Sequence, residues 1–323
     1  MPAATMPDIL CMGEPMLELN QQPPDPSGRR LYLEGHGGDT SNAAVAAARS
    51  GASVGYVTAI GQDPAGDSFL ALWAREGIDT GTVIRDAAAP TGLYCVTHDE
   101  AGHRFAFHRN GSAASRYAVR DVPEAAIRAA RLLHVSGISQ AISTSACDAV
   151  FHAMAVARAA GVAVSYDTNL RLGLWPAARA AAVIHAAIAN ADIALPSMED
   201  ATALTGLHDA DAVADFYLGL GCPLVLLKLG PAGVLVATPR RRARIAGHRV
   251  AAVDATGAGD TFAGAFLARH VAGDDPFTAA AYANVAAALS TTGYGAVAPI
   301  PRRAAVKAAA RLGEMNSPDP LLV

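Results

Sequence analysis

Short, almost continuously apolar segments alternate along this chain with longer, alanine-rich segments that have helical periodicity. Strands that are buried on both faces of a sheet have this apolar character, and regular strand–helix alternation is typical of a parallel sheet covered by helices. The sequence therefore predicts an α/β fold with a doubly wound, mostly parallel sheet flanked by helices. We expect core strands at 9–13, 53–61, 132–137, 162–167, 191–196 and 224–230, and helices at 40–50, 64–76, 145–160, 176–190 and 211–220.

Two regions, about 14–37 and 91–110, interrupt this rhythm and look like β structure without intervening helices. Within the second region, alternation places Phe105, Phe107 and Arg109 on one face of a strand. We expect these regions to form a small β-sheet, the lid sheet, which could exclude water from a site. The whole chain, 1–323, is then one domain. Because an exposed lid often pairs with that of a second copy, we also expect a homodimer or higher homo-oligomer.

The composition argues against a nucleic-acid or membrane-surface binder, because the chain carries a net charge of −4 and no basic excess. The one basic cluster, Arg240 to Arg244, is expected to form a solvated turn. Four separated cysteines form no CxxC pair, so no zinc site is indicated. We find no signal peptide and no apolar run long enough to span a bilayer. We therefore expect a cytoplasmic protein with no nucleic-acid or membrane partner.

The stretch DATGAGDTFAGAF, which begins at Asp254, joins a glycine-rich turn to helix-like sequence from about Ala258. The backbone N–H groups of Gly257, Ala258 and Gly259 could bind an anion there, assisted by the positive end of the helix dipole. Asp260 falls in the first helical turn, where a carboxylate can simply stabilise the helix. Beside an anion hole, it could instead accept a proton from an attacking hydroxyl during phosphoryl transfer. A Walker A sequence is absent.

This stretch resembles D-[TA]-x-G-A-G-D, the carboxyl-terminal signature of the ribokinase-like (PfkB) family of carbohydrate kinases. GGDTSNAAVAAARSGASVGYVTAIGQDPAGD, from Gly37 to Asp67, is similar to the amino-terminal sugar-binding stretch of the same family. The resemblance implies a ribokinase-like fold and ATP-dependent phosphorylation of a small alcohol, with Mg²⁺ as cofactor and Asp260 as the general base. It leaves open whether a monovalent cation is also needed.

Several stretches look most like the 2-keto-3-deoxygluconate kinases of the family: TGLY, FAFHRNGSAAS, SGIS, DTNLRLGLW and PSMEDATALTG. This resemblance implies that a sugar acid is converted to its 6-phosphate. Arg109 and Arg171 could clamp its carboxylate. Arg109 could equally be an exposed lid charge, and Arg171 could start a helix or form an ion pair. The alternatives are a kinase for a neutral sugar or nucleoside, such as fructose or ribose, and a non-catalytic sugar- or nucleotide-binding sensor.

The resemblance also assigns individual contacts. From the residues alone, Asn42, Tyr94, Ile138 and Asp254 are equally consistent with structural roles. The implied substrate contacts are Gly38, Asn42, Tyr94, Phe107, Arg109, Ile138, Arg171 and Asp254. The implied ATP contacts are Asn169, Ser197, Lys228, Gly230, Gly233, Gly257, Gly259 and Asn284.

Two positions depart from the pattern of the family. Many relatives have Asn-x-x-Glu where this chain has Ser197 followed by Met198, Glu199 and Asp200, so the metal-binding role could pass to Asp200, through water. Many sugar-acid kinases have Tyr at Phe107, which removes one hydroxyl contact. The neighbouring His108 is left without a role.

Overall fold

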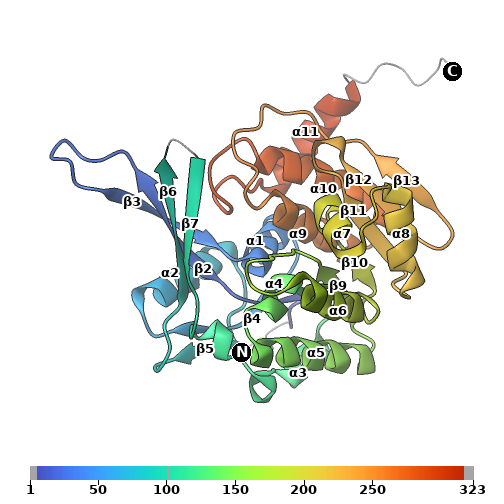
Figure 1. Cartoon of the computed structure of the whole chain (residues 1–323). Coiled ribbons are helices and arrows are strands. Elements are labelled where there is room, and N and C mark those ends of the chain that lie inside the picture. The colour runs from blue at the N-terminus through green and yellow to red at the C-terminus, as the bar shows by residue number, and fades with distance from the viewer. Residues whose placement is uncertain (1–5, 100–101, 316–323) are drawn as a thin grey trace, which may run out of the picture.

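The computed structural model describes residues 6–99 and 102–315. Its main element is a nine-stranded sheet in the order β13-β12-β11-β10-β9-β8-β1-β4-β5 (Figure 1). The strands from β11 to β5 are parallel, as predicted, whereas β12 and β13 extend the sheet in antiparallel fashion. The strands are β1 (Ile9–Met12), β4 (Val54–Gly61), β5 (Val83–Asp86), β8 (Leu132–Ser136), β9 (Ala163–Asp167), β10 (Ile193–Ala194), β11 (Leu224–Lys228), β12 (Val234–Ala237) and β13 (Arg242–Ile245).

Helices cover both faces of this sheet, and the two buried clusters that they form confirm the doubly wound arrangement. One face packs against α3 (Glu124–Ala129), α5 (Thr144–Ala159), α6 (Ala177–Ile188), α7 (Met198–Thr205) and α8 (Ala210–Gly219). The other packs against α1 (Asp39–Arg49), α2 (Pro64–Glu76), α9 (Ala258–Val271), α10 (Pro276–Ser290) and α11 (Arg303–Met315). The short α4 (Gly137–Ala141) follows β8. None of the helices in the described ranges is long and apolar enough to cross a bilayer.

The second sheet has four strands in the order β3-β2-β6-β7 and stands out from the α/β body (Figure 1). Its strands are β2 (Met16–Gln22), β3 (Leu31–Gly37), β6 (Gly92–Asp99) and β7 (Gly102–His108), all within the two ranges expected for the lid sheet. The parts of the expected domain at 1–5, 100–101 and 316–323 lie outside the described residues.

The basic cluster Arg240 to Arg244 is not simply a solvated turn, and this expectation was wrong in part. Arg242 to Arg244 belong to β13, which pairs with β12. Arg242 forms ion pairs with Asp211 and Asp215 of α8, and Arg244 Nη2 lies 2.6 Å from Asp211 Oδ2. Two of the four positive charges are therefore matched by acidic side chains of the neighbouring helix.

The order of the sheet reverses at β1. The next strands of this sheet along the chain, β4 and β5, lie on one side of β1, and the later strands from β8 onward lie on its other side. Ligands of open α/β sheets bind at such a switch point, beyond the carboxyl ends of the strands. Here α1 and α9 cross in close contact: a Cβ on Gly264 would collide with the carbonyl oxygen of Ala43. The close approach brings the first turns of both helices, with Asp39 and Asp260, to the same edge of the sheet.

Candidate active site

The glycine-rich turn before α9 is built as the sequence predicts, with Gly257 as the residue preceding the helix and Asp260 in the first turn. Gly257 has φ 73°, and a Cβ there would lie 2.9 Å from Ala296 O, so the turn requires glycine. The Ala258 N–H donates to Ala255 O at 3.2 Å. The N–H groups of Gly257 and Gly259 have no such acceptor within the described residues, which leaves them available to an anion.

Two amide side chains hold the Asp260 carboxylate. Asn42 Nδ2, from the first turns of α1, donates to Asp260 Oδ2 at 2.8 Å. Asn169 Nδ2, just beyond β9, lies 3.4 Å from Asp260 Oδ1. Asn42 and Asn169 both orient the candidate base, and their expected contacts with substrate and ATP, respectively, stay predictions.

Burial raises the pKa of Asp260 to about 7, and the negative charge of Asp39 adds to that shift. Asp167 acts in the same direction, while the Asn42 hydrogen bond and the Lys228 charge oppose it. A carboxylate with this pKa exchanges protons near neutral pH, which is the property required of a general base.

Asp39 is a residue of this site that the sequence reasoning did not single out. It is 7% exposed, and its Oδ2 accepts a long hydrogen bond, 3.3 Å, from Asn169 Nδ2. Its Oδ1 has no partner among the described residues, and burial raises its pKa. The available signal was its position between the two glycines and the asparagine of GGDTSN, at the end of a segment that leads into a helix.

Lys228 connects β11 with the turn before α9. Its Nζ lies 2.7 Å from Asp167 Oδ2 and 3.5 Å from where a Cβ on Gly259 would stand. A phosphate bound at the start of α9 would therefore meet a cation as well as free N–H groups.

The other candidate ATP contacts surround the turn after β11. Gly230 and Gly233 have φ of 58° and 103°, and a Cβ on Gly233 would collide with Ile245 O. Asn284 Nδ2, on α10, donates to Ile245 O at 3.1 Å and to Ala246 O at 3.2 Å. The side chain of Asn284 thus holds the backbone that follows β13, which is a packing role compatible with a nearby nucleotide.

The candidate metal residue Asp200 is partly engaged. Its Oδ2 accepts from Thr168 Oγ1 at 2.8 Å and from the Leu170 N–H at 3.1 Å, and its N–H donates to Ser197 Oγ at 3.0 Å. Ser197 is therefore the N-cap of α7. No group of three metal-binding side chains is found in the described ranges. A single carboxylate such as that of Asp200 is compatible with Mg²⁺, which keeps several waters and binds mainly to phosphate oxygens.

On the lid sheet, Tyr94 and Phe107 are cross-strand partners on the face that carries Glu18, with ring centroids 5.7 Å apart. The Tyr94 hydroxyl donates to Glu18 Oε2 at 2.5 Å, whereas the Phe107 side chain is 56% exposed. His108 lies on the opposite face of the strand, where it pairs with Leu93, and its side chain is exposed. His108 therefore does not share the face that carries Glu18, Tyr94 and Phe107.

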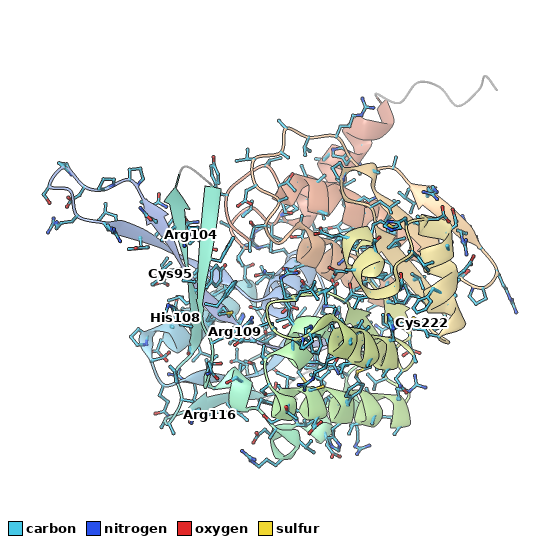
Figure 2. All side chains as sticks on the ribbon, in the orientation of Figure 1. Cys95, Arg104, His108, Arg109, Arg116 and Cys222 are labelled. Atoms are coloured by element: carbon cyan, nitrogen blue, oxygen red, sulfur yellow. The ribbon has the colours of Figure 1, made fainter. Side chains whose placement is uncertain are left out.

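Arg109 enters the site from the end of β7 and forms an ion pair that the sequence did not predict. Its Nε donates to Glu14 Oε2 at 2.8 Å, and its Nη2 contacts the same oxygen. Glu14 is fully buried and also accepts from Ser112 Oγ at 3.2 Å. Figure 2 shows Arg109 at the base of the lid sheet on the side facing the body. Arg109 is thus not an exposed lid charge, and its charge is already balanced.

The remaining candidate substrate residues are placed around the same edge. Arg171 is exposed, and its Nη1 donates to Leu170 O at 2.8 Å. Ile138 is 9% exposed in α4, and Gly38 has φ 102° with no room for a Cβ beside Glu14 O. Asp254 stabilises its loop and joins it to a second one, since its carboxylate accepts hydrogen bonds from the N–H groups of Thr256 and of Gly295 at 2.9 Å each.

Comparison with known proteins now defines the class. Residues 6–303 match the sequence pattern of the pfkB family carbohydrate kinases. The chain belongs to this family, and it is a carbohydrate kinase with a ribokinase-like fold. The expected fold and enzyme class are thereby confirmed.

Two curated relatives show how far the substrate is constrained. The 2-dehydro-3-deoxygluconokinase of Thermoproteus tenax is 33% identical over 94% of this chain and 94% of its own. A probable fructokinase-5 of Arabidopsis thaliana is also 33% identical, over 92% of this chain and 95% of its own. Kinases named for a sugar acid and for a neutral sugar are therefore equally similar in sequence.

Solved structures agree with the fold. The fructokinase of Xylella fastidiosa, crystallised with ATP, is 27% identical, with a TM-score of 0.86 over 95% of this chain and 98% of that one. A putative ribokinase II of E. coli, in complex with ATP and Mg²⁺, has the same TM-score at 23% identity over 95% and 99% of the two chains, a likeness that shows the fold. ATP and Mg²⁺ are thus the cofactors found with enzymes of this architecture.

Proposed function

We propose that this kinase transfers the γ-phosphoryl group of ATP to a small sugar acid, 2-keto-3-deoxygluconate, at its 6-hydroxyl. The observation that carries the proposal is the placement of two arginines at the edge where Asp260 lies. Asp39 is within electrostatic range of both Arg171 and the Glu14 that binds Arg109. We therefore expect both guanidinium groups to border one site.

Each arginine keeps donors for a substrate carboxylate. Arg109 uses Nε and Nη2 on Glu14, so its Nη1 has no partner among the described residues. Arg171 uses Nη1 on a backbone carbonyl. Guanidinium groups are suited to bind carboxylates through paired hydrogen bonds, and a neutral sugar offers no matching charge.

In the proposed reaction, Asp260 accepts the proton of the attacking hydroxyl as that oxygen attacks the γ-phosphorus. The bond from the γ-phosphorus to the β–γ bridging oxygen breaks, ADP leaves, and the proton remains on Asp260. The N–H groups of Gly257 and Gly259, with Lys228, stabilise the negative charge of the transferred group. Mg²⁺, when bound, neutralises phosphate charge, with Asp200 as its protein ligand through water.

A neutral sugar such as fructose is the second candidate, and two observations favour it. Glu14 balances the charge of Arg109, so the site is less positive than two free arginines would make it. In addition, Phe107 offers no hydroxyl to a polar substrate. The non-catalytic sensor receives no support from the membership of a kinase family.

The substrate is tested by measuring ADP release with 2-keto-3-deoxygluconate, other aldonic-type acids, fructose and ribose. We expect the highest kcat/KM with the sugar acid. Arg171→Ala should raise KM for the sugar acid at least tenfold more than KM for fructose, since a charge-assisted contact contributes roughly 1.5–3 kcal/mol. Arg179→Ala, on the exposed surface of α6, is the matched control. Equal losses for both substrates would contradict the carboxylate clamp.

We further propose that the protein is a homodimer joined through its lid sheets. The strands β3 and β7 are the edges of that sheet. Leu31, Leu33, Phe105 and Phe107 share one face of it, and each is between 47% and 62% exposed. Burial of such a face by a second copy would remove apolar surface from water. In analytical ultracentrifugation we expect the parent protein to sediment as a dimer and Leu33→Glu to sediment as a monomer. A parent protein that sediments as a monomer would contradict the proposed dimer.

A cytoplasmic location stays a prediction, and a need for a monovalent cation stays open. Cell fractionation tests the first, and activity in K⁺ against an equal concentration of tetramethylammonium tests the second.

A further inference from the structure

Asn169 stands between two carboxylates. Its single Nδ2 atom lies 3.3 Å from Asp39 Oδ2 and 3.4 Å from Asp260 Oδ1. It is also the one non-glycine residue in the described ranges with positive φ, 31°. Such a conformation persists only where the surroundings fix it. The N–H of Asn169, which is 3.3 Å from Asp167 Oδ1, contributes to that restraint.

Two negative charges lie close to Asp260, but only one of them is balanced. Asp167 forms a 2.7 Å ion pair with Lys228. Asp39 forms no ion pair in the described part of the chain; it is buried and keeps one oxygen, Oδ1, without a hydrogen bond. The unbalanced charge next to Asp260 is therefore that of Asp39.

We propose that Asp39 is a positioning residue for the base: through Asn169 it holds the Asp260 carboxylate, and its charge favours the protonated form that Asp260 adopts on accepting the hydroxyl proton. No proton passes to Asp39 in this step; it acts by charge and geometry alone. The proposal rests on the proposed role of Asp260 but not on the identity of the sugar.

Other charged groups bear on this pair and must be considered. Asp260 faces Asp167 and Lys228 besides Asp39, and Tyr94 of the lid sheet is within its electrostatic range. Asp39 faces Arg171 and Asp167, and the groups that are affected by its charge are Glu14, Cys11, Tyr56 and Tyr166. The phenols and the thiol stay neutral near pH 7, because burial raises their pKa values. They therefore do not titrate over the range in which Asp260 does.

The test is the pH dependence of kcat/KM for the best phosphoryl acceptor, in the parent protein and in Asp39→Asn. Removal of the charge should move the acid limb of the profile to lower pH by about one unit, because a neighbouring like charge disfavours ionisation. The plateau kcat should fall on the order of tenfold, since the base becomes weaker and less well oriented. Asp39→Glu, which keeps the charge, should leave the acid limb at the parental pH. Asp148→Asn, at an exposed position of α5, is the matched control for loss of one negative charge.

Two kinetic results would overturn the proposal. One is a raised KM for the acceptor with an unmoved acid limb, which would make Asp39 a substrate contact only. The other is an equal shift in Asp39→Glu, which would exclude the charge as the cause.

A second measurement does not depend on activity, and its titration curves are recorded on the parent protein. Carbon-13 NMR of the parent protein labelled at aspartate carboxyls should show two resonances that titrate over the same pH range with two-step curves, one of which disappears in Asp260→Asn. An Asp260 resonance with a single-step curve and an ordinary midpoint would overturn the coupling. A parent protein that phosphorylates no acceptor would instead contradict the proposed function, while the NMR titration would still decide the coupling.

Discussion

Asn42 and Asp260 lie 218 positions apart in the sequence and meet across the contact between α1 and α9, where Asn42 Nδ2 donates a 2.8 Å hydrogen bond to Asp260 Oδ2. A hydrogen bond to the ionised form favours that form, so Asn42 opposes the effects of burial and of Asp39. Two residues of α1 therefore act on the pKa of Asp260 in opposite directions. The Asn42 amide lowers it, and the negative charge of Asp39 raises it.

Asp260→Asn should retain the fold and lose activity. The amide cannot accept the hydroxyl proton, and loss of a general base costs on the order of 10²–10⁴ in rate. Steady-state kcat with ATP and the best acceptor measures this, with far-UV circular dichroism as the control for folding. Turnover near that of the parent would exclude Asp260 as the base.

The same substitution should stabilise the protein, with a defined pH dependence. The pKa of Asp260 is about 7 in the folded protein, above its ordinary value of 3.8, so its ionisation opposes folding. The gain in Asp260→Asn should be full above pH 7, decrease as the pH falls, and vanish below 3.8. Its size is on the order of 2 kcal/mol, because Asp260 is only partly buried and solvent screens part of the effect. Urea unfolding at pH 8 and pH 5 measures it, and an equal or larger gain at pH 5 would contradict the sign.

Asn42→Ala should move the acid limb of the pH–rate profile upward, opposite to the shift expected for Asp39→Asn. Without the amide donor, the ionised form of Asp260 loses a hydrogen bond, and a shift of about half to one pH unit is expected. The two variants bracket the parent, and profiles recorded under identical conditions compare them directly. A shift of both variants in the same direction would show that disturbance of the site, rather than the stated contacts, determines the pH dependence.

Gly264→Ala tests the close crossing of α1 and α9. The added methyl group would meet the Ala43 carbonyl oxygen, so the helices must separate, which typically costs about 1–3 kcal/mol. The separation would also lengthen the Asn42–Asp260 hydrogen bond and reduce kcat. Gly219→Ala, at the end of α8, has no atom within 4 Å of the new Cβ and should be neutral or slightly stabilising. Equal stability of the two variants would contradict the close contact.

The sequence predicted this fold well where one segment determines its own structure. The apolar runs identified the six core parallel strands, and the turn before Ala258 identified the start of α9. It missed β5 (Val83–Asp86), β12 and β13, which have only four residues each, so that their alternation is too short to distinguish a strand from a loop. The arginines of β13 made the segment look like a solvated turn, because the acidic partners of these arginines lie on α8 and cannot be recognised from the segment itself.

The site was predicted less completely, because several of its contacts join residues that are distant in sequence. Asp260 and its glycines are local in sequence and could be identified. The pairing of Arg109 with Glu14 joins residues 95 positions apart, and that of Lys228 with Asp167 joins residues 61 apart. Single-residue patterns carry no signal for such pairs. The amides of Asn42, Asn169 and Asn284 also support protein groups, which only tertiary contacts reveal, while their expected ligand contacts stay predictions.

The most direct test of the central claim is the product formed by the purified protein from ATP and 2-keto-3-deoxygluconate, identified by phosphorus-31 NMR with proton coupling. The account predicts a phosphate monoester on the 6-carbon, formed with a higher kcat/KM than fructose phosphate and absent in Asp260→Asn. Formation of a phosphate ester from fructose but not from the sugar acid would contradict it.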